Sequence, residues 1–107
     1  MVNVIKHEIF PTVVYQFNCG FNDLNALDVT QMDTYILANE NEDMVNQSKD
    51  GLQNLSTFRK LVDIIHEQNE KYLNDLKYKF DKIEITSMWS NHLKPNQSPP
   101  PHTHSNN

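Results

Sequence analysis

The clearest pattern of hydrophobic and polar positions lies between residues 58 and 80. Apolar side chains recur there in steps of three and four, with Asn69 as the one polar interruption: Phe58, Leu61, Val62, Ile65, Tyr72, Leu73, Leu76 and Phe80. This spacing predicts one apolar face of a long helix, with Ser56 as a plausible N-cap. We interpret the opposite face, with Lys60, Asp63, Glu67, Glu70, Lys71 and Lys77, as a solvated surface.

The remaining pattern predicts shorter elements. Residues 9–17 are rich in β-branched and aromatic side chains and favour a strand. The "NCGFND" stretch then indicates a turn in which Gly20 can take a positive φ. A less regular helical spacing covers residues 23–38, and residues 38–51 are polar and typical of a loop.

Residues 83–93 change to a period of two, which predicts another strand. Ile83, Ile85 and Trp89 would share one face with Asn91, and His92 would lie on the other face. We interpret Trp89 as core packing and His92 as structural. From residue 94 onward the only apolar groups are proline rings, so the composition changes abruptly at the end of this strand.

Composition limits the size and setting of the protein. The 107 residues suffice for one small domain, and a hydrophobic content of 37% is low for a chain that must bury its own core. We therefore expect modest stability, or stability supplied by further polypeptide. A net charge of −5 makes nucleic acid an unlikely partner. The single cysteine, Cys19, indicates a reducing compartment, and no signal peptide or membrane span is evident, so we expect a cytoplasmic protein.

Two stretches carry a family resemblance. "IFPTVVY" at residues 9–15 and "MWSNHLKPNQSPPPHTHSNN" at residues 88–107 resemble the 2-oxoglutarate/Fe(II)-dependent oxygenases of marine bacteria and their phages. The resemblance implies an α+β chain that forms the outer helices and first strands of a double-stranded β-helix, a cupin-like jelly-roll. A jelly-roll needs about eight strands, and this sequence offers far fewer, so the chain resembles only the N-terminal half and reads as truncated.

The resemblance also implies an organisation and a chemistry. Residues 1–107 would form one partial domain, with a strand and two outer helices in residues 1–80 and a strand and metal-site entry segment in residues 83–107. The implied activity is that of an oxidoreductase, a dioxygenase that couples decarboxylation of 2-oxoglutarate to hydroxylation of an unknown substrate. No catalytic side chain is assigned, and this chain alone would be inactive. A phage-encoded member would act in the host cytoplasm, and the unfinished sheet edge would favour association.

The candidate metal ligands are His102 and His104. On an extended segment residues i and i+2 point to the same side, and imidazole suits iron and zinc. Fe(II) oxygenases usually combine two histidines with a carboxylate, so His104 stands where the family has an acidic residue. Either histidines alone hold the metal or His104 orients another ligand. Asn91, on the preceding strand, is implied as a contact to 2-oxoglutarate.

Other functions fit the same residues. The chain could be a small α+β binding module in which residues 94–107 form a flexible tail rich in proline and histidine, without catalysis. A histidine pair in such a tail binds metal adventitiously. A structural zinc domain is the weakest alternative, because such sites use four ligands and usually thiolates, and Cys19 is the only cysteine.

Overall fold

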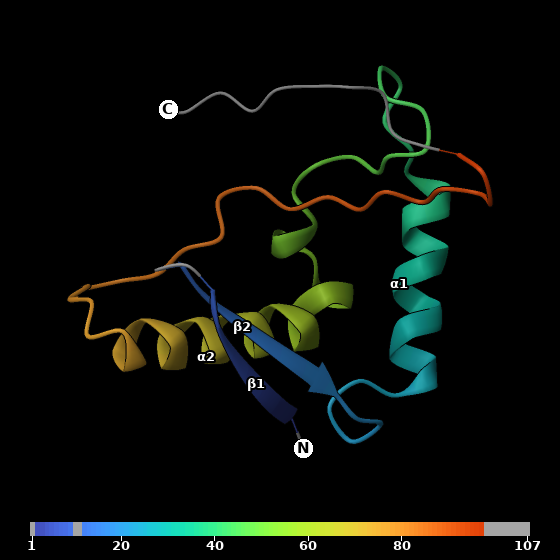
Figure 1. Cartoon of the computed structure of the whole chain (residues 1–107). Helices are drawn as coiled ribbons and strands as arrows, with labels where there is room; N and C mark the ends of the chain where they lie inside the picture. The colour runs from blue at the N-terminus through green and yellow to red at the C-terminus, as the bar shows by residue number, and fades with distance from the viewer. Residues whose placement is uncertain (1, 10–11, 98–107) are drawn as a thin grey trace.

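The computed structural model describes residues 2–9 and 12–97, which form a small α+β fold. Strands β1 (Val2–Ile9) and β2 (Thr12–Cys19) form a two-stranded antiparallel sheet. Helix α1 (Ala26–Ala38), the 3₁₀ turns η1 (Leu52–Asn54) and η2 (Ser56–Phe58), and helix α2 (Arg59–Asp75) follow. In Figure 1 the hairpin lies across α2, and an extended segment returns from the end of α2 toward α1. The expected α+β class is confirmed, while the jelly-roll remains a proposal.

The hairpin is longer than the sequence pattern predicts. β2 begins later than the predicted strand over residues 9–17, and it pairs along its full length with β1, from Val2↔Cys19 to Ile9↔Thr12. No strand was expected before residue 9, because Lys6 and Glu8 interrupt the apolar alternation there. Backbone pairing with β2 determines this strand instead, since the ladder satisfies those of its N–H and C=O groups that face β2.

The turn after β2 is closed by an aspartate. Gly20 N–H donates to the Asp23 carboxylate at 3.1 Å, and Asp23 N–H donates back to the Gly20 carbonyl at 3.0 Å. The expected positive φ at Gly20 is wrong: the described glycine in the left-handed region is Gly51, at φ 92°. The side chain of Asp23 closes this turn through its hydrogen bonds, as aspartate commonly does in turns.

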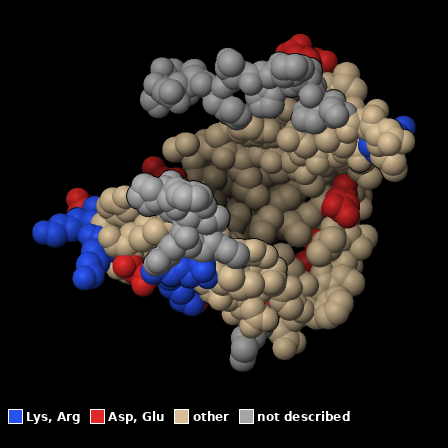
Figure 2. Space-filling view, in the orientation of Figure 1, with Lys and Arg blue, Asp and Glu red and all other residues tan. Residues whose placement is uncertain are grey.

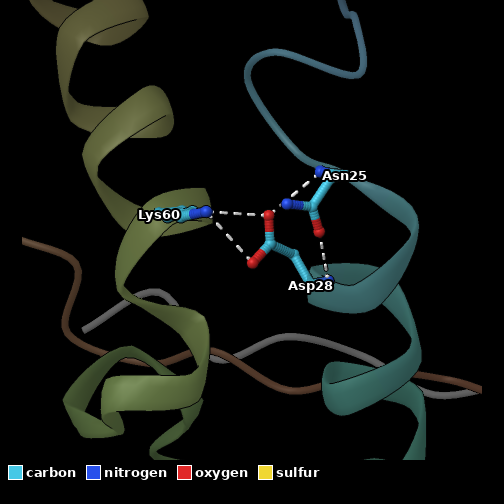
Figure 3. Close-up of polar contacts among 3 residues, drawn as sticks. All are labelled: Asn25, Asp28 and Lys60. Atoms are coloured by element: carbon cyan, nitrogen blue, oxygen red, sulfur yellow. Dashed lines mark hydrogen bonds and ion pairs between the residues drawn. The ribbon is translucent and has the colours of Figure 1, made fainter.

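Helix α1 begins at a capping box that the helical spacing did not reveal. The Asn25 side chain accepts from Asp28 N–H at 2.8 Å, and the Asp28 carboxylate accepts from Asn25 N–H at 3.0 Å. Figure 3 shows that the same carboxylate also meets Lys60 of α2, at 3.0 Å. The hydrogen bond from Asn25 N–H, followed by that from Lys60, lowers the pKa of Asp28. One short motif thus caps α1 and ties it to the start of α2.

Replacing Asn25 by alanine should destabilise the fold by about 0.5–2 kcal/mol, the usual cost of losing an N-cap side chain. Urea denaturation followed by circular dichroism would measure the change. The matched control is Asn22→Ala, because Asn22 is exposed in the preceding turn and lies outside the helix. Equal stability of the two variants would contradict the capping role of Asn25.

Helix α2 is shorter at both ends than predicted. Ser56 is not its N-cap: it begins η2, and the N-cap position of α2 is occupied by Phe58. At the other end Lys77 adopts a positive φ of 61°, and Tyr78 N–H donates to the Leu73 carbonyl at 2.9 Å. This is a Schellman stop with lysine at the position that glycine usually occupies. The helix therefore ends at Asp75 and leaves Phe80 37% exposed.

The core lies where α1, η1, η2 and α2 meet. Its buried residues are Met32, Ile36, Leu52, Phe58 and Val62. The charged face of α2 is exposed as predicted. The buried face of α2 differs from the predicted apolar face. Ile64 and Gln68 are buried, whereas Ile65 is only half-buried and Asn69 is exposed.

Docking of the hairpin explains that difference. Ile64, Gln68 and Tyr72 are spaced four residues apart and therefore lie on one stripe of α2. Tyr72 Oη donates to the Val13 carbonyl at 3.1 Å, and its ring packs edge-on against Tyr15, with the ring centroids 4.7 Å apart. An isolated hairpin is marginal in water, so these contacts stabilise the sheet.

Among the described helices none is both long and apolar enough to cross a bilayer.

Candidate functional site

The segment that carries Asn91 runs beside the loop at residues 46–52. Ser48 N–H donates to the Ser90 carbonyl and His92 N–H donates to the Asn46 carbonyl, both at 2.8 Å, and Leu52 N–H donates to Met88 at 3.1 Å. The strand predicted for residues 83–93 is therefore wrong in part. The segment is extended, but its pairing with the loop is an isolated bridge between Gln47 and Asn91.

Two side chains in the loop supply hydrogen bonds that a neighbouring strand would otherwise make. The Asp50 carboxylate accepts from the Ser87 hydroxyl at 2.7 Å and from Met88 N–H at 2.8 Å. The Ser48 hydroxyl accepts from Ser90 N–H at 2.9 Å and donates to the Lys49 carbonyl at 3.0 Å. Ser48 is 0% exposed. We call Ser48 and Asp50 the loop clamp, because together they fix residues 87–90 against the loop.

The hydrogen bonds to Asp50 favour its charged form. The Ser87 hydroxyl, followed by the backbone N–H groups of Met88 and Gly51, lowers the pKa of this carboxyl below its ordinary value. A carboxyl with a lowered pKa stabilises the fold above its ordinary pKa, near 3.9, and this contribution is lost as the pH falls through the lower folded value. The loop clamp should therefore weaken only in acid.

Replacing Asp50 by asparagine should speed amide exchange at Met88 by about tenfold near neutral pH, since hydrogen bonds to a charged acceptor are worth more than neutral ones. The difference between variant and parent should shrink as the pH falls below the ordinary carboxyl pKa. Hydrogen exchange measured by NMR over a pH series tests this. Asp63→Asn, on the exposed face of α2, is the matched control and should leave exchange at Met88 unchanged. Equal exchange in both variants would contradict the role of Asp50.

Asn91 and His92 line one cavity of about 290 Å³, together with Asp33, Ile36 and Leu37 of α1. The Nδ1 atom of His92 is buried and has no hydrogen-bond partner among the described residues. Asn91 thus lies where a contact to a bound small molecule is sterically allowed. The sequence pattern predicts a structural His92 on the face opposite Asn91, so its position beside Asn91 in this cavity is a new feature of the site.

The interpretation of Trp89 as core packing is wrong. Trp89 is 39% exposed, whereas its neighbour Met88 packs against the core. The alternation of buried and exposed side chains along residues 83–93 shifts by one position at Thr86 and Ser87, which are both exposed. Because Asp50 binds the Ser87 hydroxyl and Met88 N–H, the loop clamp fixes the face that each later residue presents.

The predicted metal ligands His102 and His104 lie outside the described residues. Among the side chains that the structure describes, which leave out those of residues 7–9 and 12, no group of three or more His, Cys, Asp or Glu is placed to hold a metal ion. The cavity beside Asn91 brings one carboxylate, Asp33, and one imidazole, His92. Those donors are fewer than the three ligands of a non-haem iron site, so the described residues alone do not fit the metal.

The loop clamp could not be predicted from the sequence. Ser48 and Asp50 lie in the polar stretch that was predicted to be a loop, and nothing in their spacing relates them to residues 87–90, about forty positions later. The "DG" pair at residues 50–51 marks a turn, and it was the one local signal available.

Comparison with family models, curated proteins and solved structures finds no match to this chain.

Proposed function

We propose that this chain supplies the N-terminal strands, outer helices and metal-site entry segment of a 2-oxoglutarate/Fe(II)-dependent oxygenase. The observation that carries the proposal is the His102-Thr-His104 sequence, which follows an extended segment that bears Asn91. Two imidazoles one residue apart on extended backbone can reach one ion. The loop clamp supports the proposal, because a ligand-bearing segment has to start from a fixed position.

The exposed apolar surface is consistent with further barrel strands. Hairpin residues Val4, Ile5 and Val14 are each about 45% exposed. Figure 2 shows a hollow between the extended segment and the hairpin, with charged side chains around its margin and uncharged atoms on its walls. Exposed apolar patches commonly mark sites where other polypeptide or ligands bind. In this proposal additional strands pair with the hairpin and close the barrel.

The roles of individual residues follow from the proposal. The metal would supply the oxidative chemistry on 2-oxoglutarate when bound. His102 would be a ligand, and His104 would either bind the metal or orient another ligand. Asn91 would donate its amide to the 2-oxoglutarate carboxylate from the wall of the cavity that it shares with His92. Oxidation of a substrate would require the remainder of the barrel, so metal binding rather than turnover is the informative measurement on this chain.

Anaerobic titration of the chain with Fe(II) tests the proposal. We expect one equivalent to bind. His102→Ala should weaken binding by more than the roughly tenfold that loss of an outer-shell partner already costs, and His7→Ala should bind like the parent. Addition of 2-oxoglutarate should tighten binding in the parent and less so in Asn91→Ala. Equal weak binding by the parent and by both histidine variants would reject the proposal.

The second candidate is a small binding module without catalysis. It is favoured by the lack of a three-ligand group among the side chains that the structure describes. In that case Asn91, His92 and Asp33 would bind a partner directly, and residues 94–107 would serve as a recognition tail. Amide exchange separates the two functions. An oxygenase segment gains protection when Fe(II) and 2-oxoglutarate are added, whereas a tail exchanges at the same rate with and without them.

A further inference from the structure

A second cavity lies where η1, α2 and the extended segment after α2 meet, and it shares no described lining residue with the cavity at Asn91. Its volume is about 330 Å³, at the lower end of the range for small-molecule sites. Most of its principal lining residues are polar or charged, and they are Gln53, Arg59, Val62, His66, Glu84 and Ile85. The cavity is therefore suited to a small polar molecule.

Two buried atoms of this wall lack the hydrogen bonds that buried polar groups normally make. The Oε1 atom of Gln53 and the Nε2 atom of His66 are both shielded from solvent, and neither has a partner among the described residues. The last side-chain torsion of glutamine and of histidine is broad, so a small rotation turns either atom toward a bound molecule. Such a molecule would recover the free energy that is lost while buried polar atoms stay unpaired.

A hydroxyl group has the hydrogen-bonding capacity to satisfy both atoms. Gln53 Oε1 is an acceptor and needs a donated hydrogen, whereas His66 Nε2 donates or accepts according to which ring nitrogen carries the proton. A hydroxyl donates its hydrogen and also accepts through its lone pairs. It can therefore donate to Gln53 and accept from a protonated Nε2 of His66.

The charges around the cavity favour a single carboxylate. Arg59 forms no ion pair among the described residues, and a guanidinium group binds carboxylates through paired hydrogen bonds. Glu84, on the same wall, is already paired with Lys82 at 2.7 Å, and its negative charge disfavours a doubly charged anion such as phosphate. Val62 and Ile85 form the aliphatic part of the wall, against which a short hydrocarbon chain would pack.

We propose that this cavity binds a small hydroxycarboxylic acid with a short branched chain. The carboxylate pairs with Arg59, the hydroxyl binds Gln53 and His66, and the chain packs against the two aliphatic residues of the wall. The ligand contacts η1, α2 and the extended segment, so its binding holds that segment against the helix. This site goes beyond the proposed oxygenase function, because it uses no residue of the cavity at Asn91 or of the predicted metal site.

The probe is α-hydroxyisovalerate, and isovalerate is the matched acid without the hydroxyl. Titration of the ¹⁵N-labelled chain, followed by NMR, should shift the Gln53 side-chain NH₂ signals and the backbone amides of η1 and the first turn of α2. The hydroxy acid should bind about tenfold more tightly than isovalerate, the value of one or two hydrogen bonds. Gln53→Leu should remove this difference and leave isovalerate binding unchanged. Gln31→Leu, on the exposed surface of α1, is the control and should bind both acids like the parent.

The carboxylate and imidazole contacts have separate tests. Arg59→Gln should weaken binding of both acids by about tenfold or more, because a hydrogen-bonded charge pair is lost. Lys49→Gln removes the same charge from an exposed loop position and should leave both affinities unchanged. His66→Phe keeps a planar ring and should reduce the preference for the hydroxy acid, which provides a second test if the Gln53 variant misfolds.

The proposal would be overturned by equal affinity of the parent for the two acids, because water rather than a ligand hydroxyl would then satisfy the two buried atoms. An unchanged preference in both Gln53→Leu and His66→Phe would place the acids elsewhere on the chain. Equal effects of Arg59→Gln and Lys49→Gln would reduce the binding to unspecific attraction between charges. Tighter binding of inorganic phosphate than of α-hydroxyisovalerate would also overturn it, since the cavity would then be a general anion site.

Discussion

Replacing Phe58 by alanine is expected to destabilise the chain by about 3–5 kcal/mol, the usual cost of truncating a buried phenylalanine. Phe58 is 2% exposed and belongs to η2, directly before α2. Its ring meets Tyr35 of α1 edge-on, with centroids 5.9 Å apart. The substitution therefore opens a cavity at the point where both helices and the 3₁₀ turns meet.

The expected loss is a large fraction of the total free energy of unfolding of a small domain. Small domains are stable by only about 5–15 kcal/mol, and the buried hydrophobic residues described here are few. Urea denaturation followed by circular dichroism should show Phe58→Ala largely unfolded or shifted to a much lower midpoint. Phe21→Ala is the matched control, because Phe21 is 82% exposed, and it should leave the midpoint nearly unchanged. Similar midpoints for the two variants would show that the core is not centred on Phe58.

Replacing Ser48 by alanine should give the second largest effect, about 1–3 kcal/mol, because it leaves Ser90 N–H without its acceptor in a partly buried position. The hydroxyl also donates to the Lys49 carbonyl, so one atom joins the loop to the segment that carries Asn91. The change removes a single oxygen from a fully buried side chain, and neighbouring atoms have little freedom to replace it.

The measurement for Ser48→Ala combines stability with local exchange. The urea midpoint should fall, and the amides of Ser90 and His92 should exchange faster than those of α1. Ser56→Ala is the matched control, because Ser56 is exposed and is not the N-cap of α2. A drop in stability with no change in exchange at Ser90 would contradict the clamp and indicate a packing effect at residue 48 alone.

The comparison of α1 and α2 shows what a hydrophobic pattern can predict. Both helices were expected, since a stripe at a spacing of three and four residues is local information. Their ends were less predictable. The Asn25 capping box fixes the start of α1 through a hydrogen bond between neighbours, whereas the stop of α2 at Lys77 uses a left-handed lysine that propensity disfavours.

The candidate site shows where a sequence pattern stops being informative. Period two at residues 83–93 correctly predicted extended backbone, but it could not predict which face would be buried. The interaction of Asp50 with residues 87 and 88 makes that choice, exposing Trp89 and turning Met88 toward the core. His102 and His104 stay predictions, because they lie outside the described residues.

By itself, the sequence determined the α+β class, the two helices, the charged face of α2 and the presence of a strand near residue 13. Each of these depends on side chains a few positions apart. Only the tertiary structure decided the pairing of β1, the buried stripe through Gln68 and the side-by-side position of Asn91 and His92. Those features depend on backbone hydrogen bonds and packing between residues that are distant in the sequence. The spacing of neighbouring residues does not predict which distant group a polar group will bind.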